Sequence, residues 1–373
     1  MITLEKIPPS MKAVVLEKPR TLACRQIPTW PLESYGDPDL VLVKVAACGV
    51  CGSDLRYYAG ENPWAQHTLG RFIENPPNIV LGHEIAGDVV AVQDSKNARW
   101  LGKRVAVLCS KTCGVCPDCI GGRSHLCPNT IHLGHGQGWG KQAFYPGAYA
   151  EYVPSWAQGC FEIPADVGYG EAAMMDILAV AVHVARRGAI EPGRPVLVMG
   201  AGPAGNSIAQ AAKCLGANRV AVTDRMDTPL EVSRRQGIDG VVDVRGKSED
   251  DLAEELRRWA GEGYGSVFDS VGTAESFRLA LKLLGKGGTM VEMAPRDREI
   301  PFNPLWLGSE RKVTTSSNFE PRDFPTALDW LEAGRFEVGA WLTDIELAAV
   351  PQIFAAIESA HGERTAFKFV VRF

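Results

Sequence analysis

The stretch PVLVMGAGPAG, residues 195–205, says more about the fold than any other part of the chain. Its apolar residues 196–199 predict a buried strand, and the alanine-rich segment 204–215 predicts a helix. Between them lies a glycine-rich turn, Gly200-Ala201-Gly202-Pro203-Ala204-Gly205. In such a unit the glycines allow a tight turn, a close approach of the backbone to a pyrophosphate, and close helix packing. The turn therefore predicts a dinucleotide site at the N-terminus of the helix, with a purely structural turn as the alternative.

Strands and helices continue to alternate after this turn. Further strands are predicted at 219–223, 266–269 and 289–293, with a helix at 249–260. Such alternation indicates a parallel sheet covered by helices. We therefore expect an α/β protein in which residues 177–309 form a doubly wound, dinucleotide-binding domain.

The second predicted strand of this domain ends near an acidic residue, Asp224, nineteen positions past Gly205. A carboxylate at this position binds the ribose 2′-hydroxyl and repels a 2′-phosphate, which favours NAD over NADP. The adjacent Arg225 leaves NADP open, because its guanidinium binds a phosphate if Asp224 turns away.

The rest of the chain has a different character. Residues 1–175 contain short valine-rich runs separated by glycine and proline clusters, which is typical of a β-rich domain. After two helical stretches, the apolar run 366–373 predicts a final strand that returns to this domain. We expect a β-rich catalytic domain formed by 1–176 and 310–373, with the nucleotide domain inserted into it.

Length and composition limit the possible functions. A chain of 373 residues predicts two domains, and 46% hydrophobic with 22% charged residues excludes a largely disordered protein. A net charge of −5 without a basic run argues against nucleic acid as a partner. The absence of any apolar run of roughly 18 residues argues against a membrane span. The charges within 1–20 argue against a signal peptide, so we expect a cytoplasmic protein.

Ten cysteines are unusual in a reducing compartment, where disulfides are rare. Four of them, within a lobe at about 109–128, follow the pattern C-x2-C-x2-C-x7-C: Cys113, Cys116, Cys119 and Cys127. Four thiolates at this spacing can surround one tetrahedral Zn²⁺ and leave no open position, which predicts a structural zinc site. An iron–sulfur cluster and unligated thiols are the alternatives. Cys109 ends an apolar strand and is predicted to be buried.

Two shorter fragments carry residue types that suit a catalytic metal. Cys51 lies in Cys-Gly-Ser-Asp, and His83 lies in Gly-His-Glu. A thiolate and an imidazole are good zinc ligands, and a catalytic zinc needs three protein ligands and an open position. Neither fragment is specific alone. Their co-occurrence with a nucleotide fold and a cysteine lobe favours a catalytic metal site.

Together these motifs resemble the zinc-dependent medium-chain alcohol dehydrogenases over nearly the whole chain. The resemblance is carried by GVCGSD (49–54), GHE (82–84), the cysteine lobe, GAYAEY (147–152), GAGPAG (200–205) and FDSVG (268–272). The segment 176–188 is most similar to the polyol (sorbitol) and threonine dehydrogenase branch. The resemblance implies a GroES-like catalytic domain, an inserted Rossmann domain and a homodimer or homotetramer.

The resemblance also implies roles for individual residues. It places Cys51 and His83 on the catalytic zinc, with Asp176 where relatives have a third ligand and Glu84 able to enter the coordination sphere. Ser53 matches the hydroxyl that passes on the alcohol proton, and Val271 lies in the motif near the nicotinamide. With the cysteine lobe, this gives two Zn²⁺ ions per chain.

Two features depart from the family or stay undecided. Arg56 stands where relatives often carry the last histidine of a proton relay. Either the relay uses Ser53, the nucleotide ribose and water, or Arg56 binds an anionic substrate group. His132 and His135 flank a glycine-rich stretch and are read as a flexible loop near the substrate, with metal binding as the alternative.

The expected function is oxidation of a secondary alcohol, polyol or amino alcohol by NAD, giving a ketone or aldehyde. Zinc lowers the pKa of the alcohol, and a hydride passes to the nicotinamide. One alternative is an aldehyde or ketone reductase of the same family that prefers NADP. The other is a non-catalytic nucleotide-binding protein that keeps the zinc lobe as a scaffold.

Overall fold

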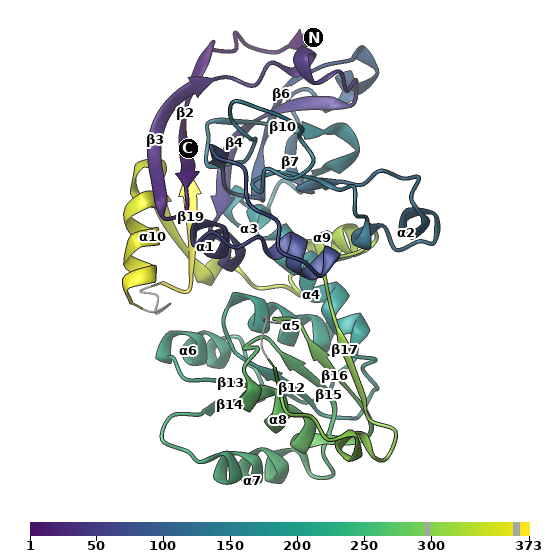
Figure 1. Ribbon diagram of the computed structural model, residues 1–373. Helices are drawn as coiled ribbons and strands as arrows, with labels where there is room; N and C mark the ends of the chain where they lie inside the picture. Colours follow the sequence, from purple (N-terminus) through teal and green to yellow (C-terminus); the bar gives the residue numbers. More distant parts are fainter. Residues whose placement is uncertain (295–298, 361–365) are drawn as a thin grey trace. The chain divides into compact units, whose positions relative to one another are not determined.

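The computed structural model describes residues 1–294, 299–360 and 366–373. The chain forms two compact units, of which unit 1 comprises Met1–Asp176 and Leu342–Phe373, and unit 2 comprises Ile177–Trp341. Figure 1 labels many of the helices and strands of both. No helix of the described residues is long and apolar enough to cross a membrane.

Unit 2 is built on six parallel strands in the order β14-β13-β12-β15-β16-β17. The strands are β12 (Val196–Met199), β13 (Val220–Asp224), β14 (Gly240–Asp243), β15 (Tyr264–Asp269), β16 (Leu284–Glu292) and β17 (Lys312–Thr315). Numbered along the chain, this order is 3-2-1-4-5-6, the doubly wound Rossmann arrangement. The predicted fold class of this unit is therefore confirmed. The strand order reverses between β12 and β15, the position where such sheets bind their ligands.

Four helices connect strands of this sheet: α5 (Pro203–Cys214), α6 (Asp227–Arg235), α7 (Glu249–Ala260) and α8 (Ala274–Leu283). The helix α4 (Met175–Arg187) precedes β12, and α9 (Asp323–Glu332) follows β17. The central strands of the sheet are apolar, and Leu197, Ala221 and Val267 are fully buried in its core. Buried strands of this kind need helices on both faces of the sheet.

Residues 310–341 differ from the sequence prediction, which grouped them with the catalytic domain. The strand β17 extends the parallel sheet of unit 2 through its pairing with β16. At the start of α9, Asp323 is fully buried, accepts a hydrogen bond from Arg186 and contacts His183 Nδ1 at 3.0 Å. These contacts tie the segment to α4 of unit 2. The four-residue run KVTT is too short and polar to have predicted a strand.

Unit 1 is rich in β-structure, as predicted. Its main sheet has the order β11-β7-β6-β4-β19-β18, with β10 also paired to β4 and β1 to β6. These strands are β1 (Ile2–Thr3), β4 (Leu40–Gly49), β6 (Glu84–Val92), β7 (Arg104–Val107), β10 (Tyr152–Trp156), β11 (Cys160–Glu162), β18 (Leu342–Glu346) and β19 (Lys368–Arg372). The pairing of β19 with β4 confirms that the last strand returns to the first domain.

Smaller elements complete unit 1. A second sheet comprises β2 (Ser10–Lys18), β3 (Thr21–Pro28) and β5 (Ile79–Val80), and a ribbon comprises β8 (Ser110–Lys111) and β9 (Ile131–His132). The helices are α1 (Gly52–Tyr58), α2 (Pro117–Ile120), α3 (Tyr169–Ala173) and α10 (Val350–Ser359).

Three neighbouring strands bring the candidate metal ligands together. The strand β4 ends at Gly49, which pairs with Glu84 at the start of β6. Because α1 follows β4 directly, Cys51 lies at the same end of the sheet. The strand β19 runs antiparallel to β4 and places Lys368 beside them. Sheet pairing thus brings together residues that are far apart in the sequence.

Candidate metal and cofactor sites

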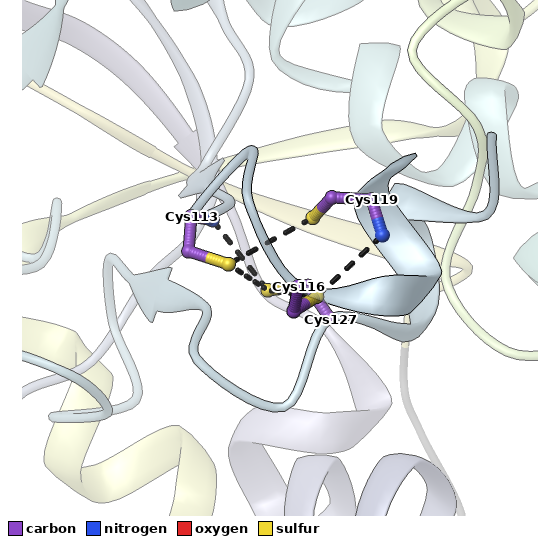
Figure 2. Close-up of side chains that lie close together, drawn as sticks. All are labelled: Cys113, Cys116, Cys119 and Cys127. Atoms are coloured by element: carbon purple, nitrogen blue, oxygen red, sulfur yellow. Dashed lines mark hydrogen bonds between the residues drawn. The ribbon is translucent and has the colours of Figure 1, made fainter. Parts of the chain in front are cut away.

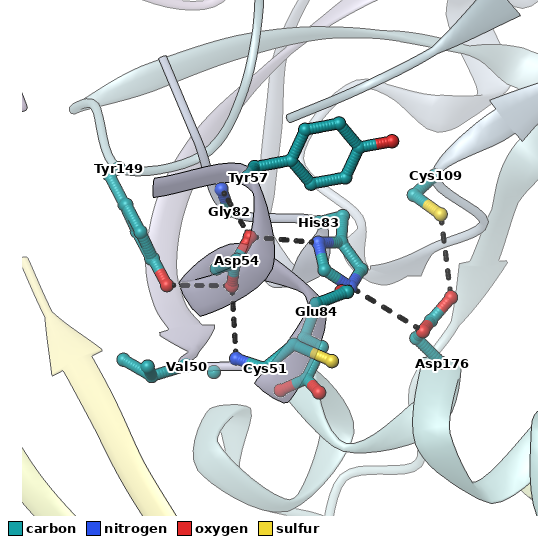
Figure 3. Close-up of polar contacts among 12 residues, drawn as sticks. Val50, Cys51, Asp54, Tyr57, Gly82, His83, Glu84, Cys109, Tyr149 and Asp176 are labelled. Atoms are coloured by element: carbon teal, nitrogen blue, oxygen red, sulfur yellow. Dashed lines mark hydrogen bonds and ion pairs between the residues drawn. The ribbon is translucent and has the colours of Figure 1, made fainter. Parts of the chain in front are cut away.

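The ligand atoms of Cys51, His83 and Glu84 lie within 4.8 Å of one another (Figure 3). Asp176, from the start of α4, adds a carboxylate whose Oδ2 lies 4.0 Å from His83 Nε2. The hydroxyl of Ser53 lies 3.3 Å from the same nitrogen. The structure thus gathers all five residues that the motifs predicted for this site.

Asp54 orients His83. Its Oδ1 lies 3.2 Å from His83 Nδ1, and its Oδ2 accepts hydrogen bonds from the Cys51 N–H and the Tyr149 hydroxyl, each at 2.9 Å. Burial alone would raise the pKa of the Asp54 carboxyl, but His83 and these hydrogen bonds outweigh it and lower that pKa. Asp54 therefore stays ionised and holds Nδ1, which leaves Nε2 to face Ser53 and Asp176. Carboxylate partners commonly orient metal-binding histidines in this way.

Glu84 is tied to the C-terminal strand. The Nζ atom of Lys368 donates to Glu84 Oε1 at 2.7 Å and to the Val50 carbonyl at 3.0 Å, and it also lies 2.7 Å from Glu84 Oε2. The side chains of Lys368 and Glu84 are 2% and 0% exposed. A buried charge is stable only with such a partner. Glu84 therefore lies within reach of a metal while Lys368 holds its carboxylate.

Asp176 has a partner that the sequence did not reveal. The Cys109 thiol donates to Asp176 Oδ1 at 3.4 Å. Burial first, and then the negative charge of Asp176, raise the pKa of Cys109 well above its usual value. The thiol therefore stays protonated and is able to donate. Cys109 is buried, as predicted, and also helps to orient a candidate ligand.

The donor set suits a catalytic zinc. Donors about 2.0–2.3 Å from a tetrahedral zinc lie roughly 3.5 Å from one another. The ligand atoms of Cys51, His83 and Glu84 lie within 4.8 Å of one another, and Asp176 Oδ2 lies 4.0 Å from His83 Nε2. A thiolate, an imidazole and a carboxylate are all zinc ligands. The residues of unit 1 therefore fit the metal that the motifs imply.

The cysteine lobe fits a second zinc equally well. Figure 2 shows the four sulfur atoms facing one another, with separations of 3.5 Å for Cys113–Cys127, 3.8 Å for Cys116–Cys127 and 4.0 Å for Cys113–Cys119. Sulfurs about 2.3 Å from a tetrahedral zinc lie roughly 3.8 Å apart. The N–H groups of Val115 and Cys116 lower the pKa of Cys113 to about 6, which favours its thiolate at neutral pH. All ten cysteines are free of disulfides.

The predicted nucleotide-binding residues meet at one edge of the sheet in unit 2. The Gly200–Gly205 turn follows β12 and leads into α5, Asp224 ends β13, and Val271 follows β15. A Cβ atom on Gly205 would lie 1.8 Å from the Gly200 carbonyl oxygen, so the helix packs where only glycine fits. Asp224 accepts hydrogen bonds from the N–H groups of Ala201 (2.8 Å) and Arg225 (2.7 Å). The turn and the acid thus form one local structure.

Arg56 is engaged within its own segment. Its guanidinium donates to Glu61 Oε2 at 2.7 Å and to Gln66 Oε1 at 2.5 Å, and it lies 3.4 Å from His67 Nε2. These contacts occupy Nε, Nη1 and Nη2. They support the relay alternative over an anion-binding role for Arg56.

The sequence motifs did not assign three residues near the candidate zinc to the site. Asp54 stands in the quoted motif, and the rule that a metal-binding histidine needs an oriented partner could have identified it. Lys368 and Cys109 carried no such signal, because each contacts its partner only after the sheet has formed.

The fold and both sites can be compared with known proteins. Residues 37–165 match the alcohol dehydrogenase GroES-like domain, and residues 203–333 match the zinc-binding dehydrogenase domain. Sorbitol dehydrogenase of Bacillus subtilis (strain 168) is 30% identical over 341 residues, which cover 91% of this chain and 90% of that protein. L-threonine 3-dehydrogenase of Escherichia coli (strain K12) is 35% identical over 277 residues, 74% of this chain and 76% of that protein.

A solved structure of a zinc-binding dehydrogenase is also similar to this chain. A zinc-binding dehydrogenase of Sinorhizobium meliloti 1021, bound to NADP, aligns with a TM-score of 0.84 and 27% identity over 98% of this chain and 99% of that chain. The chain therefore belongs to the zinc-binding alcohol dehydrogenase family, in its polyol and threonine dehydrogenase branch. It is a zinc-dependent alcohol oxidoreductase that uses a nicotinamide cofactor and a small-molecule substrate.

The buried Glu84–Lys368 pair leads to a test of stability. In Lys368→Met the Glu84 carboxylate loses its partner, so we expect the free energy of unfolding to fall by about 3–5 kcal/mol. Chemical denaturation of the two proteins measures this difference.

The exposed pair Lys103–Glu162 provides a matched control, because its N–O distance is also 2.7 Å but its side chains are 44% and 55% exposed. We expect Lys103→Met to cost less than about 1 kcal/mol. Equal losses in the two variants would contradict the role of Lys368.

Proposed function

We propose that this protein oxidises a secondary alcohol, polyol or amino alcohol to a ketone or aldehyde with NAD as hydride acceptor. The observation that carries the proposal is the group formed by Cys51, His83 and Glu84, whose ligand atoms lie within 4.8 Å of one another, with Asp176 beside His83. A scaffold protein has no need of such a donor set in addition to the cysteine lobe. The family relatives named for sorbitol and L-threonine support this range of alcohols.

The chain's own residues have separate roles in the proposed reaction. When bound, zinc supplies the charge that acidifies the alcohol, and the nicotinamide accepts its hydride. Cys51 and His83 hold the metal, and Asp54 keeps His83 Nε2 turned toward it. Ser53 Oγ, 3.3 Å from that nitrogen, takes up the alcohol proton while its own hydroxyl proton passes to the nucleotide ribose and water. Since Arg56 does not deprotonate at neutral pH, the proton leaves through Ser53.

NAD is the proposed cofactor because Asp224 ends β13 beside the glycine-rich turn. Its two oxygens bind backbone N–H groups, and a carboxylate has further lone pairs for a ribose hydroxyl. The negative charge opposes a 2′-phosphate. The relative bound to NADP makes an NADP-preferring reductase the second candidate.

The proposed reaction is tested with the zinc-loaded protein, NAD and a panel of secondary alcohols, diols and amino alcohols. We expect formation of NADH with at least one of them. In Cys51→Ser the metal loses its thiolate, so turnover should fall by about 1000-fold, which corresponds to roughly 4 kcal/mol of transition-state stabilisation, while NAD still binds. Nicotinamide absorbance and cofactor titration provide the two readouts.

Cys48→Ser is the matched control, because Cys48 is a buried neighbour that the motifs do not assign to the metal. It should keep its zinc and its turnover. Full activity in Cys51→Ser, or no reaction with any alcohol when two zinc ions are bound, would contradict the proposed function.

Cofactor preference is tested by Asp224→Asn. The amide keeps an oxygen acceptor for the backbone N–H groups but removes the negative charge. We therefore expect the ratio of kcat/KM for NADP to that for NAD to rise by about tenfold, or 1.4 kcal/mol. Asp227→Asn, at an exposed acid paired with Arg245, should leave the ratio unchanged. A wild-type preference for NADP would refute the assignment of NAD.

A further inference from the structure

The glycine-rich segment after the cysteine lobe is a fixed part of unit 1, in contrast to the flexible loop predicted from its composition. His132 ends β9, and its N–H donates to the Gln137 carbonyl at 2.9 Å. The Gly134 N–H donates to the Pro146 carbonyl at 2.7 Å. A Cβ atom on Gly134 would lie 2.6 Å from the Gly82 carbonyl oxygen. The segment therefore packs against the residue that precedes His83.

This packing places His135 beside the candidate zinc ligands. Its ring stacks on Tyr57 and on His132, each with a centroid distance of 4.4 Å. Since two rings cannot share one face of a third at this distance, the imidazole lies between them. Its centroid is also 4.6 Å from that of His83. The orientation of His135 is therefore fixed by aromatic contacts alone.

Both ring nitrogens of His135 are buried, and neither has a hydrogen-bond partner among the described residues. The residue is 7% exposed. A neutral imidazole offers one N–H donor and one nitrogen acceptor. Buried polar atoms without partners are rare and need an explanation.

A metal ion does not explain these nitrogens well. A His135 nitrogen, a His83 nitrogen and an Asp54 oxygen lie within 4.8 Å of one another. Asp54, however, already contacts His83 Nδ1 and accepts from the Cys51 N–H and the Tyr149 hydroxyl. A cation there would have to displace the contacts that orient His83.

The two rings stacked on His135 differ in their own polar contacts. The Tyr57 hydroxyl donates to Asn62 Oδ1 at 3.2 Å, whereas His132 Nδ1 is also buried without a partner among the described residues. His135 therefore combines contact with a candidate zinc ligand and hydrogen-bonding capacity that the protein does not use.

We propose that His135 binds a hydroxyl on the carbon next to the reacting alcohol and so selects vicinal diols over amino alcohols. The inference rests on the proposed function and adds a specificity-determining residue to it. A hydroxyl can both donate and accept, so it pairs with whichever nitrogen of a neutral imidazole faces it, whereas an ammonium group only donates and pairs only with the acceptor nitrogen. Because the His135 and His83 rings are in contact, a hydroxyl one carbon away from an alcohol held beside His83 is within reach of His135.

The test compares three substrates that differ in one substituent: propane-1,2-diol, propan-2-ol and 1-aminopropan-2-ol. The wild-type protein should have a higher kcat/KM for the diol than for either of the other two. Phenylalanine preserves the stack but has no nitrogens, so in His135→Phe we expect the diol to propan-2-ol ratio to fall by about tenfold. His135→Gln, which keeps a donor and an acceptor, should restore part of that ratio.

Tyr57→Phe is the matched control, because it removes a polar atom from the same stack that already has a partner. It should keep the wild-type ratio within about twofold. An unchanged ratio in His135→Phe, an equal fall in Tyr57→Phe, or a wild-type preference for the amino alcohol would overturn the proposal.

A second measurement does not depend on turnover. In protein labelled with ¹⁵N-histidine, propane-1,2-diol should shift the two ring-nitrogen resonances of His135, which His135→Phe assigns by their loss. Propan-2-ol at the same concentration should not shift them, and equal shifts would overturn the proposal. If no alcohol is oxidised, the proposed function fails while this measurement still decides whether His135 contacts a diol.

Discussion

Two carboxylates beside the candidate zinc, those of Asp54 and Glu84, are completely buried, and each has a partner supplied from elsewhere in unit 1. Asp54 has His83, the Cys51 N–H and the Tyr149 hydroxyl, whereas Glu84 has Lys368. Because uncompensated charges are not stable in a protein interior, these pairings also fix the ends of β4, β6 and β19. The geometry of the candidate zinc ligands follows from them, since Cys51 begins the helix whose N-terminus Asp54 caps. Fold stability and the position of the ligands therefore depend on the same contacts.

The same arrangement explains how a site assembled from distant segments can have a defined donor set. Asp54 leaves only His83 Nε2 free, Lys368 holds Glu84, and the Cys109 thiol holds one oxygen of Asp176. Each candidate side-chain ligand other than Cys51 thus has a partner that limits its orientation, as is common around metal sites. His135 differs from these residues because its ring is held by stacking and its nitrogens have no partner among the described residues.

Local sequence patterns predicted much of the fold and of the candidate sites. The run 196–199 and the glycine-rich turn identified β12 and the start of α5, because strand, turn and helix signals are all short-range. The cysteine spacing identified the lobe for the same reason. By contrast, β17 was missed because KVTT has no apolar pattern and becomes a strand only by pairing with β16. Lys368 was missed because its partner Glu84 is 284 positions away. His135 was assigned to a flexible loop because glycine content does not reveal that the turn packs against Gly82.

The central claim is that unit 1 holds a catalytic zinc at Cys51 and His83, separate from the zinc of the cysteine lobe. Anomalous diffraction from crystals of the zinc-loaded protein, measured on either side of the zinc absorption edge, tests it directly. We predict two peaks per chain, one among the sulfurs of Cys113, Cys116, Cys119 and Cys127, and one in contact with Cys51 Sγ and His83 Nε2. A single peak confined to the cysteine lobe in crystals grown with excess zinc would contradict the claim.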